Sequence, residues 1–136
     1  MTRATRGLLD TSTLLDLQHL TDTEHLPAQP LISTITLAEL SVGPLVARDD
    51  AERAARQAHL QQAEADFEAL PFDAAAARAF GRVAASLRQH GATARARSYD
   101  AMIAAVALAN DLPLHTGNPA DFSGIDALVV VEVPAP

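Results

Sequence analysis

The 136-residue chain contains no cysteine and no lysine, and each absence excludes a class of chemistry. Without cysteine there is no disulfide scaffold, no thiol nucleophile and no zinc site with thiolate ligands. All 10 basic residues are arginine, which rules out a phosphate-loop lysine and Schiff-base chemistry. A chain without cysteine is also compatible with a reducing compartment.

Aromatic residues and long hydrophobic runs are scarce as well. Hydrophobic residues make up 49% of the chain but aromatic residues only 4%, and many of the hydrophobic residues are alanine. This composition favours helices packed closely against a sheet of leucine, isoleucine and valine. The run AMIAAVALA at 101–109 is about half the roughly 20 residues that a membrane helix needs, and the apolar run after the basic N-terminus ends too soon for a secretion signal. We therefore expect a single domain over residues 1–136, soluble and cytoplasmic, with no membrane partner.

Strand-like and helix-like segments alternate along the chain. Short apolar segments that predict strands lie at 6–10, 31–35, 69–72, 113–116 and 128–133. Segments with helical spacing or strong helix propensity lie at 11–20, 36–46, 48–70, 73–91 and 98–112. Asp73 is expected to cap the fourth helix and Gly91 to end it, and the pair Gly43-Pro44 to bend or end the second. The alternation predicts an α/β fold whose central sheet has four to five short, mostly parallel strands with helices on both faces.

Four acidic residues fall at the carboxyl ends of the predicted strands or just beyond them. Asp10 ends the first strand, and Glu39 lies in the first turn of the helix that follows the second strand. Asp100 begins the most apolar helix, and Asp121 follows the fourth strand. Because ligands bind beyond the carboxyl ends of the strands in such sheets, these carboxylates are expected to meet at one site.

Each acidic residue also has an ordinary structural explanation. Asp10 and Asp100 can cap the helices that follow them, Asp121 can stabilise a turn, and Glu39 can lie at an exposed helix edge. Two carboxylates about 4 Å apart, however, repel by ~4 kcal/mol at an effective dielectric constant near 20, and a fold is stabilised by only ~5–15 kcal/mol. If the four carboxylates converge, a divalent cation is the simplest physical reason, and oxygen ligands favour Mg²⁺ or Mn²⁺ over Zn²⁺.

Four motifs occur in an order typical of one protein family: LLDTS at 8–12, TLAEL followed by Gly43 at 36–43, DAMIAAVAL at 100–108 and TGNPADF at 116–122. Through this ordered set, and over essentially its whole length, the chain resembles the PIN-domain family, specifically the VapC-type ribonuclease toxins of toxin–antitoxin pairs. No single motif is highly specific, whereas the ordered set is. The resemblance implies a three-layer α/β/α PIN-like fold and hydrolysis of RNA phosphodiester bonds.

The same resemblance implies roles for particular residues. The catalytic residues, which would hold Mg²⁺ or Mn²⁺, are Asp10, Glu39, Asp100 and Asp121. The polar residues that would contact phosphate oxygens or metal-bound waters are Thr11, Ser12, Thr116 and Asn118. Some PIN nucleases carry an aspartate at the position of Asn118, so the asparagine lowers the charge of the site and leaves open whether it holds one metal ion or two.

The resemblance also implies partners. A VapC-type toxin pairs with a VapB-type antitoxin whose basic and apolar segment blocks the acidic pocket, and it usually forms a homodimer. The net charge of −7 favours such a basic ligand but argues against RNA binding through bulk charge. Arg95 and Arg97, just before Asp100, are therefore the candidates for RNA phosphate contacts. The alternative is that these two arginines are solvated or pair with surface carboxylates.

Two other functions fit some of the same residues. A haloacid-dehalogenase-like phosphatase, another metal-dependent phosphoryl hydrolase, would also place an aspartate after a strand. It needs a lysine and a second acid two residues after that aspartate, where Ser12 stands here. A non-catalytic acidic module that binds a basic peptide would keep the four carboxylates without any need for a metal ion.

Overall fold

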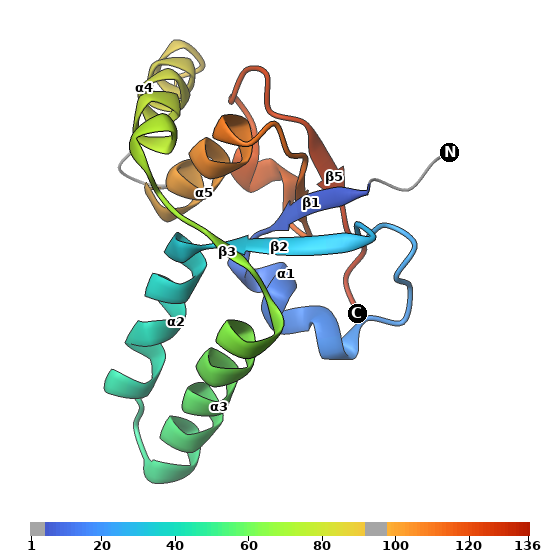
Figure 1. The fold of residues 1–136 in the computed structure, drawn as a ribbon, viewed down its shortest axis with the longest axis vertical. Helices are drawn as coiled ribbons and strands as arrows, with labels where there is room; N and C mark the ends of the chain where they lie inside the picture. Colours follow the sequence, from blue (N-terminus) through green and yellow to red (C-terminus); the bar gives the residue numbers. More distant parts are fainter. Residues whose placement is uncertain (1–4, 92–97) are drawn as a thin grey trace.

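Five parallel strands form the centre of the structure, a computed structural model that describes residues 5–91 and 98–136 (Figure 1). The strands are β1 (Arg6–Leu9), β2 (Gln29–Ser33), β3 (Ala69–Leu70), β4 (Leu114–Thr116) and β5 (Val130–Glu132), and their order in the sheet is β3-β2-β1-β4-β5. Leu8 of β1 pairs with Leu31 of β2 and with Leu114 of β4, so β1 lies in the middle of the sheet. The predicted α/β fold with a parallel sheet is confirmed.

The helices connect these strands, and α1 to α4 each begin at a side-chain cap. They are α1 (Thr11–Asp16), the 3₁₀ turn η1 (Leu17–His19), α2 (Thr34–Leu45), α3 (Asp50–Asp66), α4 (Ala74–Gln89), α5 (Ser98–Ala109) and the 3₁₀ turn η3 (Pro119–Phe122). Asp73 caps α4 by accepting a hydrogen bond from the backbone N–H of Ala76 at 3.0 Å, and Gly91 follows the end of that helix with φ +80°, both as predicted. Within the described residues, no helix is long and apolar enough to cross a membrane.

The predicted boundary between the second strand and the second helix differs from the structure. Thr34 and Ile35, assigned to the strand 31–35 for their β-branched side chains, instead form the first turn of α2. The reason is that Ser33 Oγ accepts a hydrogen bond from the backbone N–H of Thr36 at 3.2 Å, which starts the helix immediately after Ser33. Pro44 lies in the last turn of α2, in agreement with the prediction that the pair Gly43-Pro44 bends or ends this helix. The helix ends with the next residue, so the missing N–H of the proline removes little helical structure.

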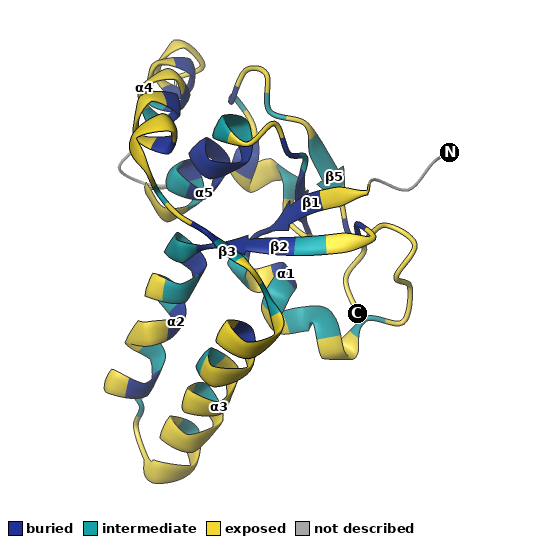
Figure 2. Ribbon diagram, in the orientation of Figure 1, coloured by how far each residue is buried: buried dark blue, intermediate teal, exposed yellow. Residues whose placement is uncertain are grey.

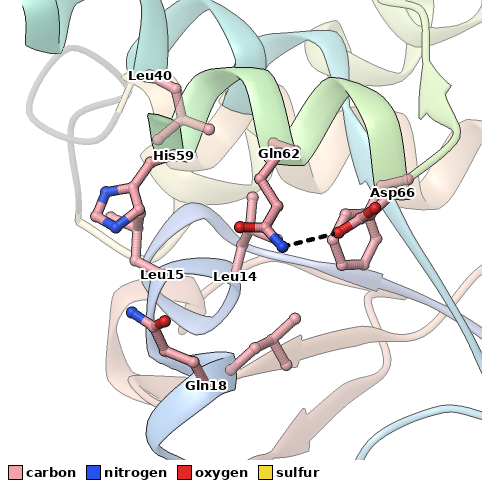
Figure 3. A pocket seen from close by; sticks show the side chains of 10 residues that line it. Leu14, Leu15, Gln18, Leu40, His59, Gln62 and Asp66 are labelled. Carbon is pink, nitrogen blue, oxygen red and sulfur yellow. Dashed lines mark hydrogen bonds between the residues drawn. The ribbon is translucent and has the colours of Figure 1, made fainter. Parts of the chain in front are cut away.

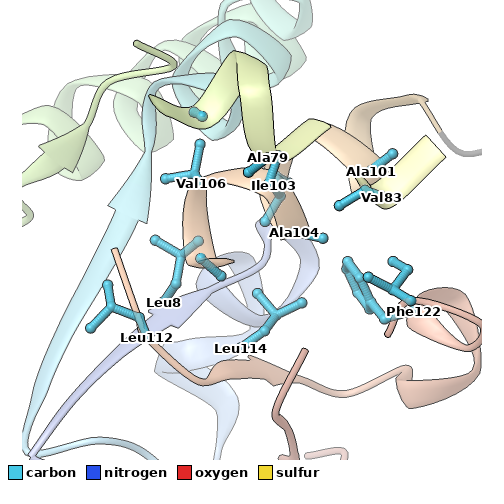
Figure 4. Packing of buried hydrophobic residues seen from close by; sticks show 14 of the residues in the cluster. Leu8, Ala79, Val83, Ala101, Ile103, Ala104, Val106, Leu112, Leu114 and Phe122 are labelled. Carbon is cyan, nitrogen blue, oxygen red and sulfur yellow. The ribbon is translucent and has the colours of Figure 1, made fainter. Parts of the chain in front are cut away.

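Helices cover both faces of the sheet because adjacent strand residues point to opposite sides. Leu8 and Leu31 belong to the core beneath α4 and α5, whereas Leu9 and Ile32 belong to the core beneath α1, α2 and α3. In the first core, fully buried alanines of α4 and α5 allow these two helices to pack closely (Figure 4). Figure 2 shows that most of β1 and β2 and the middle of α5 are buried, whereas β5 is partly exposed and much of α3 is exposed.

The carboxyl ends of the parallel strands lie along one edge of the sheet. Asp10 follows β1 there, α2 begins directly after β2, and Gly117 follows β4. The helix α5 contacts both α2 and η3, so the elements that carry all four acidic residues adjoin one another at this side of the molecule. The edge is the place where the sequence predicts the site.

Gly7 and His115 provide a test of the packing of β1 against β4. A Cβ atom at Gly7 would meet the His115 ring, 2.5 Å from Nδ1, and His115 is only 1% exposed. We expect Gly7→Ala to lower the free energy of unfolding by ~1–3 kcal/mol, because the ring would have to move within a packed core. Urea unfolding measures this change.

Gly81→Ala is the matched control for that substitution. Gly81 lies inside α4, and an added Cβ would have no neighbour within 4 Å. Alanine there should raise the free energy of unfolding by ~0.5–1 kcal/mol through its better helix propensity. Equal stability of Gly7→Ala and the unmodified protein would contradict the close approach of β1 and β4.

Candidate functional site

Asp10 is a buried carboxylate held by donors from two other elements. Its side chain is 4% exposed. Oδ1 accepts a hydrogen bond from the backbone N–H of Thr13 at 3.0 Å, which makes Asp10 the N-cap of α1. Oδ2 accepts from Thr116 Oγ1 at 2.7 Å and, over a longer 3.4 Å, from Ser12 Oγ. A buried charge is costly unless it is hydrogen-bonded, so these donors are what allow a strand to end in an aspartate here.

The hydroxyl of Thr116 ties the end of β4 to Asp10. A threonine hydroxyl carries one hydrogen, and that of Thr116 is donated to Asp10. Thr116 Oγ1 in turn accepts from the backbone N–H of Asn118 at 2.9 Å, and Thr13 Oγ1 accepts from the backbone N–H of Gly117 at 3.1 Å. The segment 116–118 is thereby fixed against the first turn of α1.

Glu39 is held at the same edge by a second pair of hydroxyls. Thr11 Oγ1 donates to Glu39 Oε1 at 2.7 Å and lies 3.0 Å from Thr36 Oγ1. Glu39 itself is partly exposed, whereas Thr36 is completely buried. These contacts join the start of α1 to the first turns of α2, so Asp10 and Glu39 extend from neighbouring, mutually bonded segments.

Asp100 and Asp121 lie on the elements that adjoin this network. Asp100 is a partly exposed residue in the first turn of α5, and Asp121 is an exposed residue in η3. Across residues 5–91 and 98–136, no three histidine, aspartate or glutamate side chains are close enough to form a ready-made metal-binding group. The structure bonds Ser12 and Thr116 to Asp10 and bonds Asn118 to Thr116. Separately, it bonds Thr11 to Glu39. The metal-binding role of all four carboxylates stays a prediction.

The oxygen atoms that could act as metal ligands at this edge suit a hard divalent cation. The side chains there present carboxylate and hydroxyl oxygens, which are the ligands of Mg²⁺ and Mn²⁺, and the chain has no cysteine. His115 precedes Thr116 but is buried against Gly7, and its Nδ1 has no hydrogen-bond partner in the described part of the chain. Burial lowers the pKa of His115 below its ordinary value of 6.5, against the opposing effect of a hydrogen bond with the Pro113 backbone. His115 is thus neutral at pH 7 and adds no charge to the site.

Two arginines predicted to bind RNA lie outside the described structure, and two threonines at this edge were not predicted. Arg95 and Arg97 lie outside the described residues, so their contacts with RNA stay a prediction. Thr13 and Thr36 were not singled out by sequence reasoning, although both help to hold the carboxylates. The spacing of Thr36 and Glu39 offered a signal, because residues three apart share one face of a helix.

Comparison with known proteins decides the family. A model of the PIN domain matches residues 7–128 of the chain. The chain belongs to the PIN-domain family. It is 38% identical over 129 residues to ribonuclease VapC5 of Mycobacterium tuberculosis, and the match covers 93% of each chain. The predicted membership of the VapC type of PIN domain is thereby confirmed.

Solved structures agree with this assignment. The PIN domain superposes on the crystal structure of VapBC-5 from Mycobacterium tuberculosis, a member of the VapBC family of toxin–antitoxin systems, with a TM-score of 0.80 and 35% identity over 95% of this chain and 99% of the other. VapBC2 from Rickettsia felis, bound to a DNA fragment from its promoter, gives a TM-score of 0.77 over 94% and 98%. At 23% identity this second likeness shows the fold alone. The predicted three-layer PIN-like architecture is confirmed.

The PIN domain also has an apolar groove between α1, α2 and α3. Its volume is about 290 Å³. Leu14 and Leu40 line it together with polar residues of α3, among them Gln62 and Asp66, which are joined by a hydrogen bond of 3.2 Å (Figure 3). Leu15, which also lines the groove, is 38% exposed. The groove thus combines an apolar lining with a polar α3 side that carries one carboxylate, Asp66.

The bond between Thr116 and Asp10 predicts a measurable contribution to stability. Thr116→Val keeps the shape of the side chain but leaves Asp10 Oδ2 and the backbone N–H of Asn118 without this hydroxyl. We expect the free energy of unfolding to fall by ~1–3 kcal/mol, the cost of buried polar groups that lose a partner. Urea unfolding measures the loss, and Thr116→Ser, which keeps the hydroxyl, should recover most of it. A valine variant as stable as the serine variant would show that the bond is unimportant.

Proposed function

We propose that this PIN-domain protein is a VapC-type toxin, an endoribonuclease that hydrolyses RNA phosphodiester bonds with Mg²⁺ or Mn²⁺ and is neutralised by a cognate VapB-type antitoxin. The observation that carries the proposal is the buried Asp10 carboxylate, fixed beside the Glu39 network at the carboxyl edge of the sheet. The 38% sequence identity to ribonuclease VapC5 supports the choice of RNA as substrate.

In the proposed mechanism the chain supplies carboxylate oxygens that are already oriented to bind a cation. The residues that would hold the cation are Asp10, Glu39, Asp100 and Asp121. When bound, Mg²⁺ or Mn²⁺ lowers the pKa of water at the site and offsets the negative charge that develops on the phosphate. Thr116 and Thr11 donate to carboxylates and so keep Asp10 and Glu39 oriented before substrate arrives.

The remaining polar residues would position the RNA. Ser12 and the exposed Asn118 lie next to the held carboxylates and would contact phosphate oxygens or water. Arg95 and Arg97 would bind phosphates that approach this acidic chain. In the hydrolysis, the oxygen of water bonds to phosphorus and loses a proton, while the bond to the leaving oxygen breaks and that oxygen takes up a proton. Neither a nucleophilic serine nor a histidine base is needed.

A non-catalytic acidic module that binds a basic peptide is the alternative to this mechanism. It would use the same carboxylates without metal-dependent cleavage. The phosphatase alternative is set aside, because the chain is a PIN domain and has neither the lysine nor the second acid that such an enzyme needs. An assay for RNA cleavage therefore separates the two readings that remain.

Asp10→Asn tests the catalytic proposal. The substitution keeps an oxygen that can cap α1 but removes the charge that would hold the cation. We expect RNA cleavage to fall by at least ~100-fold, beyond the 10–100-fold effect of groups that only orient metal ligands. Cleavage of an end-labelled structured RNA, with and without chelator, measures the effect, and mapping the fragment ends identifies the preferred sequence.

Asp111→Asn is the matched control for Asp10→Asn. Asp111 is exposed, precedes β4 at the opposite edge of the sheet, and has φ 53°, a conformation that asparagine also adopts. The Asp111→Asn variant should cleave RNA at the same rate as the unmodified protein. Cleavage that survives both chelator and Asp10→Asn would refute the metal mechanism, and tight peptide binding without any cleavage would favour the inert module.

The apolar groove between α1, α2 and α3 is the surface that we propose for the antitoxin. Its apolar lining suits the hydrophobic face of an amphipathic segment, and Asp66 on the α3 side suits basic residues beside that face. The net charge of −7 favours a basic partner in the same way.

The expected homodimer stays a prediction. Its candidate contacts are three exposed apolar residues at the end of α2: Val42, Leu45 and Val46.

Leu15→Arg tests the antitoxin groove. The arginine would place a charge at the apolar lining, and we expect affinity for the cognate VapB-type antitoxin to fall by roughly 30-fold, the effect of losing a ~2 kcal/mol contact. Titration calorimetry measures the affinity. Val129→Arg is the control, because Val129 is an exposed apolar residue just before β5 and does not line the groove. Unchanged affinity of Leu15→Arg, or an equal loss in Val129→Arg, would place the antitoxin elsewhere.

A further inference from the structure

Thr36 is a completely buried hydroxyl residue in the first turn of α2 whose side chain bonds to another element. Its Oγ1 lies 3.0 Å from Thr11 Oγ1 in α1. Because Thr36 lies in the first turn, no earlier turn of α2 offers its hydroxyl a carbonyl, and the hydroxyl is directed at the start of a neighbouring helix. Helix formation alone does not require that contact.

The direction of this hydrogen bond follows from the number of hydrogens available. A hydroxyl has one hydrogen to donate, and Thr11 donates its hydrogen to Glu39 Oε1 at 2.7 Å. The hydrogen between the two threonines must therefore come from Thr36. The result is a relay in which Thr36 donates to Thr11 and Thr11 donates to the Glu39 carboxylate.

Such a relay fixes the orientation of the carboxylate at its end. Each donated bond polarises the next, and a bond to a charged acceptor is stronger than one between neutral groups. Glu39 has a long side chain and is only partly buried, so packing restrains it less than it restrains Asp10. The hydroxyl of Thr11 is free to rotate about its C–O bond unless an acceptor and a donor hold it, and Thr36 is the donor.

We propose that Thr36 is a positioning residue for Glu39: through Thr11 it holds the Glu39 carboxylate in the orientation that cation binding at this edge requires. The inference rests on the proposed function. Thr36 itself touches neither cation nor RNA. A parallel relay runs from the backbone N–H of Asn118 through Thr116 to Asp10, but it begins at the backbone, whereas the Thr36 relay begins at a side chain that substitution can remove.

The test compares Thr36→Val, which removes the hydroxyl and keeps the shape, with Thr36→Ser, which keeps the hydroxyl. Calorimetric titration of Mn²⁺ into the protein without RNA gives the cation affinity directly. We expect Thr36→Val to weaken Mn²⁺ binding by about tenfold, at the low end of the 10–100-fold effect of groups that orient metal ligands. Thr36→Ser should lie within about threefold of the unmodified protein, since it retains the same donor. The Mg²⁺ concentration that gives half-maximal RNA cleavage should shift in parallel.

Thr34→Val separates positioning from a purely structural effect. Thr34 lies in the same turn of α2, and its Oγ1 accepts a hydrogen bond from the backbone N–H of Phe72 at 3.2 Å rather than a bond within the Thr11–Glu39 relay. This variant should lower the thermal unfolding temperature without weakening Mn²⁺ binding. A melting curve of each variant shows that it is folded under the conditions of the titration.

The outcomes distinguish failure of this inference from failure of the proposed function. If Asp10→Asn loses Mn²⁺ binding and cleavage but Thr36→Val binds Mn²⁺ as the unmodified protein does, only the positioning role is overturned. It is also overturned if Thr34→Val weakens binding as much as Thr36→Val, or if serine fails as valine does. If the unmodified protein neither binds Mn²⁺ nor cleaves RNA, both the function and the inference fall.

Discussion

The carboxylate of Asp10, 4% exposed at the end of the central strand, is the constraint on which the site depends. A charge at that position is unfavourable unless donors surround it. Thr13 supplies one through its backbone, and Thr116 supplies another through its hydroxyl, so the donors come from α1 and β4. These donors are available only if α1 begins directly after β1 and β4 lies beside it. The bonds that stabilise the charge therefore also fix the elements around it.

Glu39 extends this arrangement to α2, and the parallel sheet makes the meeting possible. Strands that run in one direction deliver their following helices to one edge, where the hydroxyl of Thr11 joins Glu39 to the start of α1. Both carboxylates thus receive a hydroxyl donor that is itself held by a second donor, the backbone of Asn118 or the side chain of Thr36. A Mg²⁺ or Mn²⁺ site needs oxygen ligands whose orientation is fixed before the cation binds, and the two held carboxylates provide them.

Local signals predicted most of the fold and only part of the site. Asp73 and Gly91 mark the ends of α4 because cap geometry depends on a few neighbouring residues. Asp10 illustrates a choice that sequence left open: it caps α1 through Oδ1 and receives hydroxyls on Oδ2, so both explanations hold at once. The spacing of Thr36 and Glu39 places both on one face of α2, but the contact between Thr36 and Thr11 joins residues 25 apart in the sequence, which no local pattern encodes. Strand 31–35 was overextended because the Ser33 cap overrides the β-branched preference of the residues after it.

The whole account depends on the scattered carboxylates forming a single cation-binding site at the edge of the sheet. A crystal structure of the protein grown with Mn²⁺, with anomalous scattering to locate the ion, tests it most directly. The account predicts a Mn²⁺ peak within coordinating distance, roughly 2.0–2.4 Å, of carboxylate oxygens from Asp10 and Asp100, with Glu39 and Asp121 bound directly or through water. Mn²⁺ bound away from Asp10, or Asp10 and Asp100 too far apart to share an ion in the loaded protein, would contradict it.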